Sequence, residues 1–461
     1  MSAASQETLS SLWEKQKNFF STGITKPISF RKTALSRLAQ GIRARQNDIL
    51  TALQTDLHKC EAEARLTELY LIFQEIGHAL RHVSHWSRPK WAAPSLSQLP
   101  GRSFTQLEPY GTTLILAPWN YPFQLSLVPL IHAIAAGNCA VVKPSEHAPA
   151  SAQVIQEILK DCFPPAYVTA VPGGRDESSA LLDQPFDFIF FTGGETVGRL
   201  VLEKAAQHLT PVCLELGGKS PCIVDATANV RLAAKRIAFG KVLNAGQTCV
   251  APDYVFVHES VREPFLLWLR RYFQKFTSCP DQYPKIIRPD RFEHLIHLMD
   301  TETIFCGGEC NAGTLQISPT VLYPVHTDSP VMQEEIFGPL LPVFSFSFLH
   351  EAITFIKARP KPLALYLFTR SKRNEQAILN RLSFGGGCIN DTILHLASPH
   401  TGFGGVGASG MGRYHGKEGM ELFSHRKTML KQSTRADMPL RYPPYGPAKT
   451  WIARRMTWGH S

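Results

Sequence analysis

The chain has 461 residues, of which 44% are hydrophobic and 19% charged, a balance typical of a globular protein with two or three domains. Its ten cysteines are too few and too scattered for a disulfide scaffold, so they predict reduced thiols in a cytoplasmic protein. Residues 426–461 hold eight basic residues and one acid, and this C-terminal segment therefore supplies +7 of the net charge of +10. The near-neutral remainder argues against a general nucleic-acid surface.

Residues 1–87 are predicted to be helical, because Leu35, Leu38 and Ile42 recur at the spacing of one helix face. The N-terminus lacks the basic and apolar segments of a signal peptide. Residues 112–142 contain no Asp, Glu, Lys or Arg and are long enough to span a bilayer, but Pro, Gly and Asn interrupt them repeatedly. We therefore expect a buried strand, a turn, a helix and a second buried strand there.

From residue 112 onward, short apolar runs alternate with segments of helix length. Five runs precede residue 217, and each ends in Gly, Pro, Asn or Ser: 113–117, 139–143, 167–171, 186–192 and 212–216. This punctuation predicts a parallel, doubly wound α/β sheet. A second series of such runs after residue 217 predicts a second α/β domain. Ligands of such sheets bind beyond the carboxyl ends of the strands, so the polar residues after each run are the first site candidates.

Two of these candidates follow the first and second runs. In "PWNYP", the amide of Asn120 could donate to a developing oxyanion, or Asn120 could simply be a turn residue. In "VVKPSE", Lys143 could bind a phosphate or ribose oxygen, and Glu146 could accept hydrogen bonds from ribose hydroxyls. The alternative for this pair is a solvated lysine and an acid that stabilises the start of a helix.

Two more candidates follow the fourth and fifth runs. "FTGGETVG" (191–198) opens a helix with glycines that let a pyrophosphate approach free backbone N–H groups. It is not the G-x-G-x-x-G fingerprint, so a plain strand-to-helix turn stays open. Glu215 is an acid in an apolar strand, where burial would raise its pKa towards that of a general base. The alternative is a structural ion pair.

Cys249 differs from the other cysteines, which mostly lie in apolar runs, because its neighbours in "LNAGQTCVAP" are polar residues and glycine. A reachable thiolate is a good nucleophile, whereas most cysteines are buried bystanders, and the local sequence leaves both possibilities open. Cys306 and Cys310 of "CGGEC" form the only close pair. No second pair or nearby histidine completes a zinc set, so we expect no metal.

Together these motifs resemble the aldehyde dehydrogenase superfamily over nearly the whole chain. "PWNYP", "KPSE", "FTGGETVG", "ELGGKSP", "NAGQTC", "QEEIFGP" (333–339) and "FGGVGASGMGRYHG" (403–416) occur in the order of that family, and "GQTCVAPDY", "RYHGK", "FSHRK" and "LRYPP" are similar to its class 3 branch. The resemblance implies a variant Rossmann cofactor domain (1–87 and 108–213), an α/β catalytic domain (214–427), a small bridging element for oligomerisation (88–107 and 428–445) and a basic tail (446–461).

The resemblance also implies the role of each candidate. Cys249 would be the nucleophile, Glu215 the general base, and Asn120 with the backbone N–H of Cys249 the oxyanion hole. The implied dinucleotide contacts are Lys143 and Glu146 at the adenosine ribose, the turn with Gly193, Gly194, Val197 and Gly198 at the pyrophosphate, and Glu335 and Phe337 at the nicotinamide ribose and ring. One departure stands out: after "FTG" the family usually has Ser or Asn and then Thr, where this chain has Gly194 and Glu195.

The expected reaction is the oxidation of an aldehyde, medium or long aliphatic or aromatic, to the carboxylate through a cysteine thiohemiacetal and thioester. NAD is the expected cofactor, with NADP tolerated. One alternative is a CoA-acylating dehydrogenase, against which Glu215 argues because a hydrolytic base would waste the thioester. Another is a thiol hydrolase without a cofactor, which would have no use for the cofactor-like turns.

The resemblance further implies a homodimer. No nucleic-acid partner is expected. The basic tail carries Trp451 and Ile452 among its charges, a composition that suits weak contact with a membrane surface. Surface charge that only aids solubility is the other interpretation.

Overall fold

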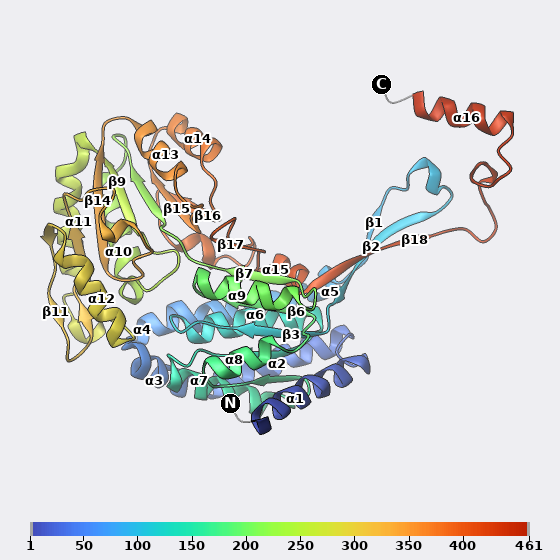
Figure 1. The fold of residues 1–461 in the computed structure, drawn as a ribbon, viewed down its shortest axis with the longest axis horizontal. Coiled ribbons are helices and arrows are strands. Elements are labelled where there is room, and N and C mark those ends of the chain that lie inside the picture. The colour runs from blue at the N-terminus through green and yellow to red at the C-terminus, as the bar shows by residue number, and fades with distance from the viewer. Residues whose placement is uncertain (1–2, 459–461) are drawn as a thin grey trace.

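The computed structural model describes the backbone of residues 3–458 and the side chains of residues 9–457. Figure 1 shows two α/β units packed against each other and a long arm that leads away from them to a C-terminal helix. The last three residues of the predicted basic tail, 459–461, lie outside the described part.

The first unit is built on a six-stranded sheet. Its strands are β3 (Thr112–Leu116), β4 (Cys139–Lys143), β5 (Val168–Ala170), β6 (Phe188–Thr192), β7 (Val212–Glu215) and β17 (Gly410–Met411). Their order is β17-β7-β6-β3-β4-β5; β3 to β7 run parallel, and β17 pairs antiparallel with β7 at the edge. The five apolar runs before residue 217 are therefore the five parallel strands, as their punctuation predicts.

Helices bury both faces of this sheet. One face carries α1 (Ala3–Ser21), α8 (Arg175–Leu182) and α9 (Glu195–Ala206); the other carries α2 (Ile28–Ala44), α3 (Gln46–Leu57), α5 (Tyr70–Trp86), α6 (Pro122–Ala136) and α7 (Pro149–Cys162). All fifteen residues of α6 are buried. The charge-free run 112–142 is thus a core helix between two strands, which confirms the expectation from its interruptions. Among residues 3–458, no helix combines the length and the apolar character that crossing a membrane requires.

The second unit contains a seven-stranded sheet. Its strands are β8 (Pro221–Val224), β9 (Tyr254–His258), β10 (Ile304–Cys306), β13 (Thr320–Leu322), β14 (Leu340–Phe346), β15 (Ala364–Phe368) and β16 (Gly386–Ile389), in the order β10-β13-β14-β9-β8-β15-β16. Only the edge strand β10 is antiparallel among them. The helices between them are α10 (Val230–Val242), α11 (Arg262–Phe276), α12 (Pro289–Asp300), α13 (Leu349–Lys357) and α14 (Lys372–Arg381). The second α/β domain predicted from the sequence is confirmed.

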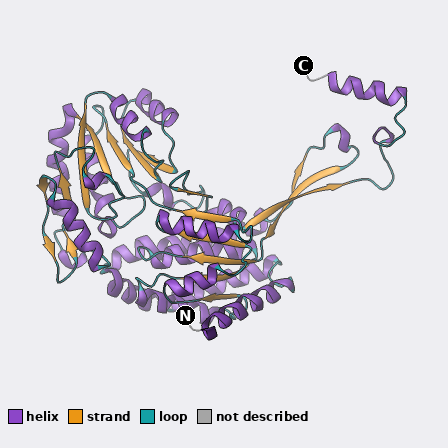
Figure 2. Cartoon of the chain, in the orientation of Figure 1, coloured by secondary structure: helices purple, strands orange, loops and turns teal. Residues whose placement is uncertain are grey.

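An antiparallel three-stranded sheet forms the arm (Figures 1 and 2). It consists of β1 (Lys90–Ala92), β2 (Arg102–Pro109) and β18 (Ser424–Lys431), with β2 in the centre. Beyond it the chain ends in α16 (Pro447–Trp458), which stands apart from both α/β units in Figure 1. Large apolar side chains are exposed on the arm (Trp91, Met429, Leu430) and on α16 (Trp451, Ile452, Met456).

The chain passes from the first unit to the second after β7 and returns to the first near the C-terminus. The sequence gives little indication of either crossing. The predicted border between residues 213 and 214 falls inside β7. Near the C-terminus, β17 and α15 (Gly416–Leu422) pack on the first unit, because Gly410 pairs with Glu215 and α15 contacts α5 and α6. This return segment carries Tyr414 and His415 back towards the middle of the molecule.

Candidate active site

Cys249 lies in a turn between the two sheets. The turn follows a 3₁₀ helix, η3 (Leu243–Gly246), in which Asn244 and Ala245 have φ angles of 50° and 52° and Gly246 has a φ of 73°. At Gly246 a Cβ would come within 2.3 Å of the carbonyl oxygen of Gly338, so only glycine fits there. Three successive left-handed residues fold the chain back sharply before Cys249.

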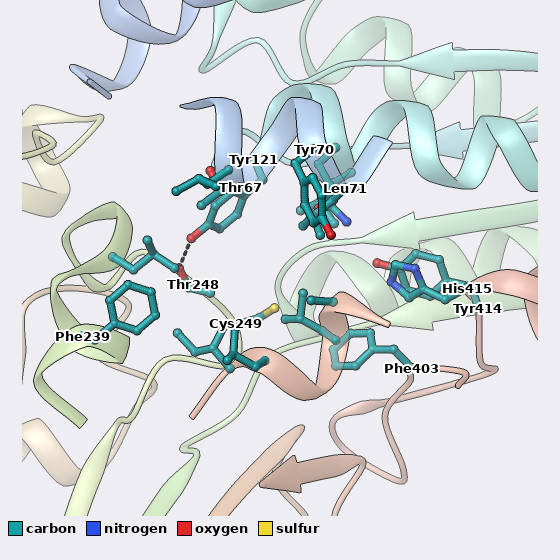
Figure 3. Close-up of a pocket in the computed structure, with 18 residues that line it drawn as sticks. Thr67, Tyr70, Leu71, Tyr121, Phe239, Thr248, Cys249, Phe403, Tyr414 and His415 are labelled. Carbon is teal, nitrogen blue, oxygen red and sulfur yellow. Dashed lines mark hydrogen bonds between the residues drawn. The ribbon is translucent and has the colours of Figure 1, made fainter. Parts of the chain in front are cut away.

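The Cys249 side chain borders two cavities. The first, of about 310 Å³, is almost entirely apolar and comes from both units and the return segment. Figure 3 shows the sulfur at its floor, with Tyr70 and Leu71 opposite and Phe403 to one side. The residues that line it are Leu66, Thr67, Tyr70, Leu71, Tyr121, Gln124, Leu125, Phe239, Leu243, Thr248, Cys249, Ile393, Leu394, Leu396, Ala397, Phe403, Tyr414 and His415.

The second cavity, of about 270 Å³, shares Cys249 and Leu125 with the first and has a more polar lining. Six of the residues predicted from the sequence line it besides Cys249: Asn120, Gly193, Gly194, Glu215, Glu335 and Phe337. They arrive from four separate segments: the loops after β3, β6 and β13, and the end of β7. The structure therefore gathers the predicted thiol, acid and amide around one space.

Glu215 ends β7 and is only 2% exposed. No described side chain hydrogen bonds to either of its carboxylate oxygens. Burial raises the pKa of Glu215 well above its ordinary range, while Arg413 and the backbone N–H of Gly405 oppose the rise. A carboxyl group with a raised pKa beside a cavity is a stronger proton acceptor than a solvated one.

Glu335 reaches into the same cavity from the "QEEIFGP" loop. Its carboxylate lies so close to Gly217 that a Cβ there would be 2.0 Å from Glu335 Oε2, so a larger residue at position 217 would displace the carboxylate. Burial and the nearby charge of Asp253 raise the pKa of Glu335 to about 8. Phe337, at a φ of 47°, packs edge-on against Trp119 with ring centroids 5.5 Å apart.

Asn120 is 3% exposed and joins the first-strand loop to the cysteine turn. Its Nδ2 donates to the carbonyl oxygen of Gln247 at 3.0 Å. One N–H of the amide thus holds the side chain in place, and the other is left for a group in the cavity. Tyr121, the next residue, hydrogen bonds through its hydroxyl to Thr248 Oγ1 at 2.7 Å (Figure 3).

Four predicted cofactor residues lie outside these two cavities, near the carboxyl ends of β4 and β6. Lys143 Nζ donates to the carbonyl oxygens of Pro144 and Gly173 and lies 3.8 Å from Glu146 Oε2. Val197 is 49% exposed on α9, and Gly198 packs against Leu216.

Glu195, the acid of the unusual pair after "FTG", pairs with Arg199 one helical turn later. Its charge is thus partly neutralised, and Gly194 leaves open space at the start of α9.

Several residues that shape the site were not singled out from the sequence. Lys59 and Glu68 lie behind Asn120, and Tyr414 and His415 close one end of the apolar cavity. In the sequence, the charged residues of segment 59–68 cannot be told apart from those of a solvent-exposed helix face. Residues 413–416 belong to a motif that resembles the family, but the sequence assigns no role to Tyr414 or His415.

His415 belongs to a buried cluster with Glu75 and His132. Glu75 accepts a hydrogen bond from the N–H of Gly416, and its pKa is lowered to about 2, with His415 and His132 outweighing the effect of burial. This cluster holds His415 in place where it lines the apolar cavity. Cys306, half-buried, and Cys310, exposed, belong to no group of described residues that could hold a metal.

Comparisons with known proteins identify the family of this chain. A model of the aldehyde dehydrogenase family matches residues 1–429. The chain is 48% identical over 436 residues to the 4,4'-diaponeurosporen-aldehyde dehydrogenase of Staphylococcus aureus, covering 93% of this chain and 95% of that one. It is 41% identical over 436 residues to aldehyde dehydrogenase family 3 member B1 of Homo sapiens, covering 93% of each.

A solved structure described as the substrate-bound state of Staphylococcus aureus AldH has the same fold, with a TM-score of 0.94 at 45% identity over 97% of this chain and 99% of that one. The chain therefore belongs to the aldehyde dehydrogenase family. It is an oxidoreductase that converts an aldehyde to the carboxylic acid.

The electrostatics of Cys249 give a testable prediction. Burial raises the pKa of its thiol, and the charges of Glu335 and Glu215 raise it further, so less thiolate is present at neutral pH than for a free cysteine. Alkylation of Cys249 by iodoacetamide in the cofactor-free protein should be slow at pH 7.5 and should still accelerate above pH 9. Because the pKa of Glu335 is about 8, its carboxyl group is mostly uncharged at pH 7.5 and mostly charged at pH 9.5. Glu335→Gln should therefore change the rate little at pH 7.5 and speed alkylation at pH 9.5 by roughly three- to tenfold.

Peptide mass spectrometry reports the alkylation rate of each cysteine, and exposed Cys279 serves as the internal control. Its rate should be the same in both proteins. An equal or slower rate at Cys249 in Glu335→Gln at pH 9.5 would contradict the electrostatic account.

Proposed function

We propose that Cys249 is the nucleophile, Glu215 the general base, and Asn120 with the backbone N–H of Cys249 the oxyanion hole of this aldehyde dehydrogenase. The observation that carries the proposal is the position of Cys249, which lines both an apolar cavity and a second cavity that is also lined by Glu215 and Asn120. An aldehyde can approach from the first cavity and a dinucleotide from the second, so that both meet at the sulfur.

The sulfur of Cys249, as thiolate, adds to the aldehyde carbon and forms a thiohemiacetal whose oxygen carries the negative charge. The free N–H of the Asn120 amide and the N–H of Cys249 stabilise that charge. A bound NAD would supply the hydride acceptor, and loss of the hydride from this carbon would leave a thioester on Cys249. Glu215 then takes a proton from water, the hydroxide adds to the thioester, and the carbon–sulfur bond breaks to release the carboxylate and the thiolate.

The described residues fit a dinucleotide. The N-terminus of α9 has no side-chain cap, so its free N–H groups suit a pyrophosphate at the turn with Gly193, Gly194, Val197 and Gly198. Buried Lys143 and exposed Glu146 suit the adenosine ribose, and the partly buried Glu335 and Phe337 suit the nicotinamide ribose and ring. Because Glu146 carries a negative charge, we propose that NAD is preferred and NADP tolerated.

The apolar cavity supports a medium or long aliphatic or aromatic aldehyde as substrate. No Lys, Arg, Asp or Glu lines it, so a small charged semialdehyde would find no partner there. The Staphylococcus aureus relative is named for 4,4'-diaponeurosporen-aldehyde, and an apolar substrate for this chain is in line with that name.

The exposed apolar side chains of the arm support a homodimer in which two arms contact each other. All ten cysteines are unpaired, which supports a reducing, cytoplasmic location. In α16, the Arg455 guanidinium lies 4.2 Å from the Trp451 ring centroid, which places basic and aromatic groups together on an exposed surface. Such a surface supports weak contact with a membrane, and the alternative is that its charge only aids solubility. Salt-sensitive cosedimentation with anionic vesicles would be the sign of such contact.

Glu215→Gln should separate the two halves of the reaction. Hydride transfer needs only Cys249 and the oxyanion hole, so stopped-flow absorbance with decanal and NAD should show one NADH per active site in a first burst. Steady-state turnover should then fall by roughly 10²- to 10⁴-fold, because the thioester lacks its general base. Cys249→Ala should show neither phase.

Unchanged steady-state turnover in Glu215→Gln would place the base elsewhere. Analysis of the wild-type product with CoA present tests the acylating alternative: we expect the carboxylate, and an acyl-CoA would overturn the hydrolytic mechanism.

The preference for NAD gives a third prediction. We expect kcat/KM to be roughly tenfold or more higher with NAD than with NADP, because Glu146 repels a 2′-phosphate. Glu146→Gln removes the charge but keeps a hydrogen-bonding group. It should therefore bring the two kcat/KM values closer together, mainly by raising kcat/KM with NADP. A wild-type preference for NADP would contradict the assignment of Glu146.

The dimer is tested by light scattering coupled to gel filtration. The wild-type protein should have about twice the chain mass of 51.3 kDa. Replacing the exposed arm residues Trp91 and Met429 by Glu should shift it to the monomer, because the charges would be buried without partners. Leu209→Glu, at a residue 90% exposed away from the arm, is the control and should leave the mass unchanged. A dimer that survives the arm substitutions would refute contact through this surface.

A further inference from the structure

A fully buried ion pair lies directly behind the proposed oxyanion donor. Lys59 Nζ and Glu68 Oε1 are 3.1 Å apart, and both side chains have no exposed surface. They belong to the segment between α3 and α5, which contains α4 (Glu61–Ala64) and a single π-helical turn, η1 (Arg65–Leu69). Burying two charges costs several kcal/mol unless they are well paired, and the reaction described above uses neither of them.

Lys59 is directed at the loop that carries the amide. Its Nζ donates to the carbonyl oxygen of Asn120 at 2.9 Å and lies 3.9 Å from the centroid of the Tyr121 ring. With Glu68, these contacts account for the three N–H groups of the ammonium. The ammonium therefore holds the peptide that joins Asn120 to Tyr121.

Glu68 holds the other end of the same loop. Its Oε2 accepts the backbone N–H of Gln124 at 2.7 Å, in the first turn of α6. That helix begins with Tyr121 as N-cap and Pro122 as its first residue, and it has no side-chain cap of its own. The carboxylate supplies the missing acceptor at the positive end of the helix, so the Lys59–Glu68 pair fixes the loop on both sides of Tyr121.

The same loop is joined to the cysteine turn. Asn244 Nδ2 donates to the carbonyl oxygens of Asn120 at 2.9 Å and Gln247 at 3.1 Å, and Asn120 Nδ2 donates to the same oxygen of Gln247. Glu63, four residues after Lys59, accepts the N–H of Asn244 at 2.9 Å. The helical segment 59–68 thus contacts both loops whose relative position sets the distance from the Asn120 amide to Cys249.

We propose that Lys59, with Glu68 as its counterion, is a positioning residue for the oxyanion donor. The inference rests on the proposed role of Asn120. A donor is effective only when it is held within a fraction of an ångström of the developing oxyanion, and a misplacement of about 1 Å can cost about 100-fold in rate. Because Glu68 neutralises Lys59, the pair adds no net charge to the site and acts through geometry.

The test uses Lys59→Met/Glu68→Gln, which removes both charges together and keeps an oxygen acceptor for Gln124. The first-turnover NADH rate with decanal and NAD should fall roughly tenfold or more, towards the loss expected when an oxyanion donor is removed. Alkylation of Cys249 by iodoacetamide should stay within about twofold of wild type, because that reaction forms no oxyanion. NAD affinity, measured by fluorescence titration, should also be unchanged.

A merely structural role would change these measurements differently. A loosened fold would alter alkylation and NAD affinity together with the NADH rate, and that outcome overturns the proposal. An unchanged NADH rate overturns it as well. Lys90→Met/Glu421→Gln, which removes an ion pair of 3.0 Å at the base of the arm, is the control and should leave all three measurements at the wild-type level.

A double-mutant cycle with Asn120→Ala separates this inference from the proposed function. If Lys59 acts through Asn120, adding Lys59→Met/Glu68→Gln to Asn120→Ala should lower the first-turnover NADH rate by less than about twofold. Additive losses overturn the positioning role and leave Asn120 as the donor. A wild-type rate for Asn120→Ala alone would instead refute the proposed oxyanion hole.

Should the Met variant fail to fold, Lys59→Gln/Glu68→Gln enters the same cycle. The amide of the new glutamine at position 59 can still donate towards Asn120. If both variants fold, the NADH rate should therefore fall less in the Gln variant than in the Met variant. A loss that is additive with Asn120→Ala overturns the proposal for this variant too.

Discussion

The structure depends on one constraint: a single thiol has to face two separate cavities. The turn after η3 meets this constraint with three successive left-handed residues, one of them Gly246 in contact with the backbone of Gly338. Left-handed backbone at Asn244 and Ala245 costs energy, and it persists only because neighbouring groups hold it. Here those groups are Glu63 and the carbonyl oxygens of Asn120 and Gln247, so the position of Cys249 depends on helices far away in the sequence.

The charges around the thiol follow from the same arrangement. Two acids that belong to the second cavity, Glu215 and Glu335, face a sulfur that is already desolvated, and all three groups have raised pKa values. Positive charge near the loops is neutralised by its own partners, as in the pair of Lys59 with Glu68. Arg288 and Arg291 also line the second cavity, where Arg288 pairs with Asp290 and Arg291 lies 3.9 Å from Glu334, so these cations have acidic partners as well.

Much of the fold could be predicted from the sequence because its signals are local. Apolar runs punctuated by Gly, Pro and Asn identify the parallel strands, and their ends carry Asn120 and Glu215. The crossing of the chain from one unit to the other could not be predicted, since β17 has only two residues and pairs across nearly two hundred positions. For the same reason the walls built by Tyr414 and His415 were missed. Lys59 was missed because burial, and not residue type, separates it from an ordinary surface lysine.

The central claim is that the reacting carbon is held on Cys249 between the two cavities. The most direct measurement is mass spectrometry of the protein quenched within milliseconds of mixing with decanal and NAD. The account predicts an acyl group on the peptide that contains Cys249, formed only when aldehyde and NAD are both present. An acyl group on another residue, or one that forms on Cys249 without NAD, would contradict it.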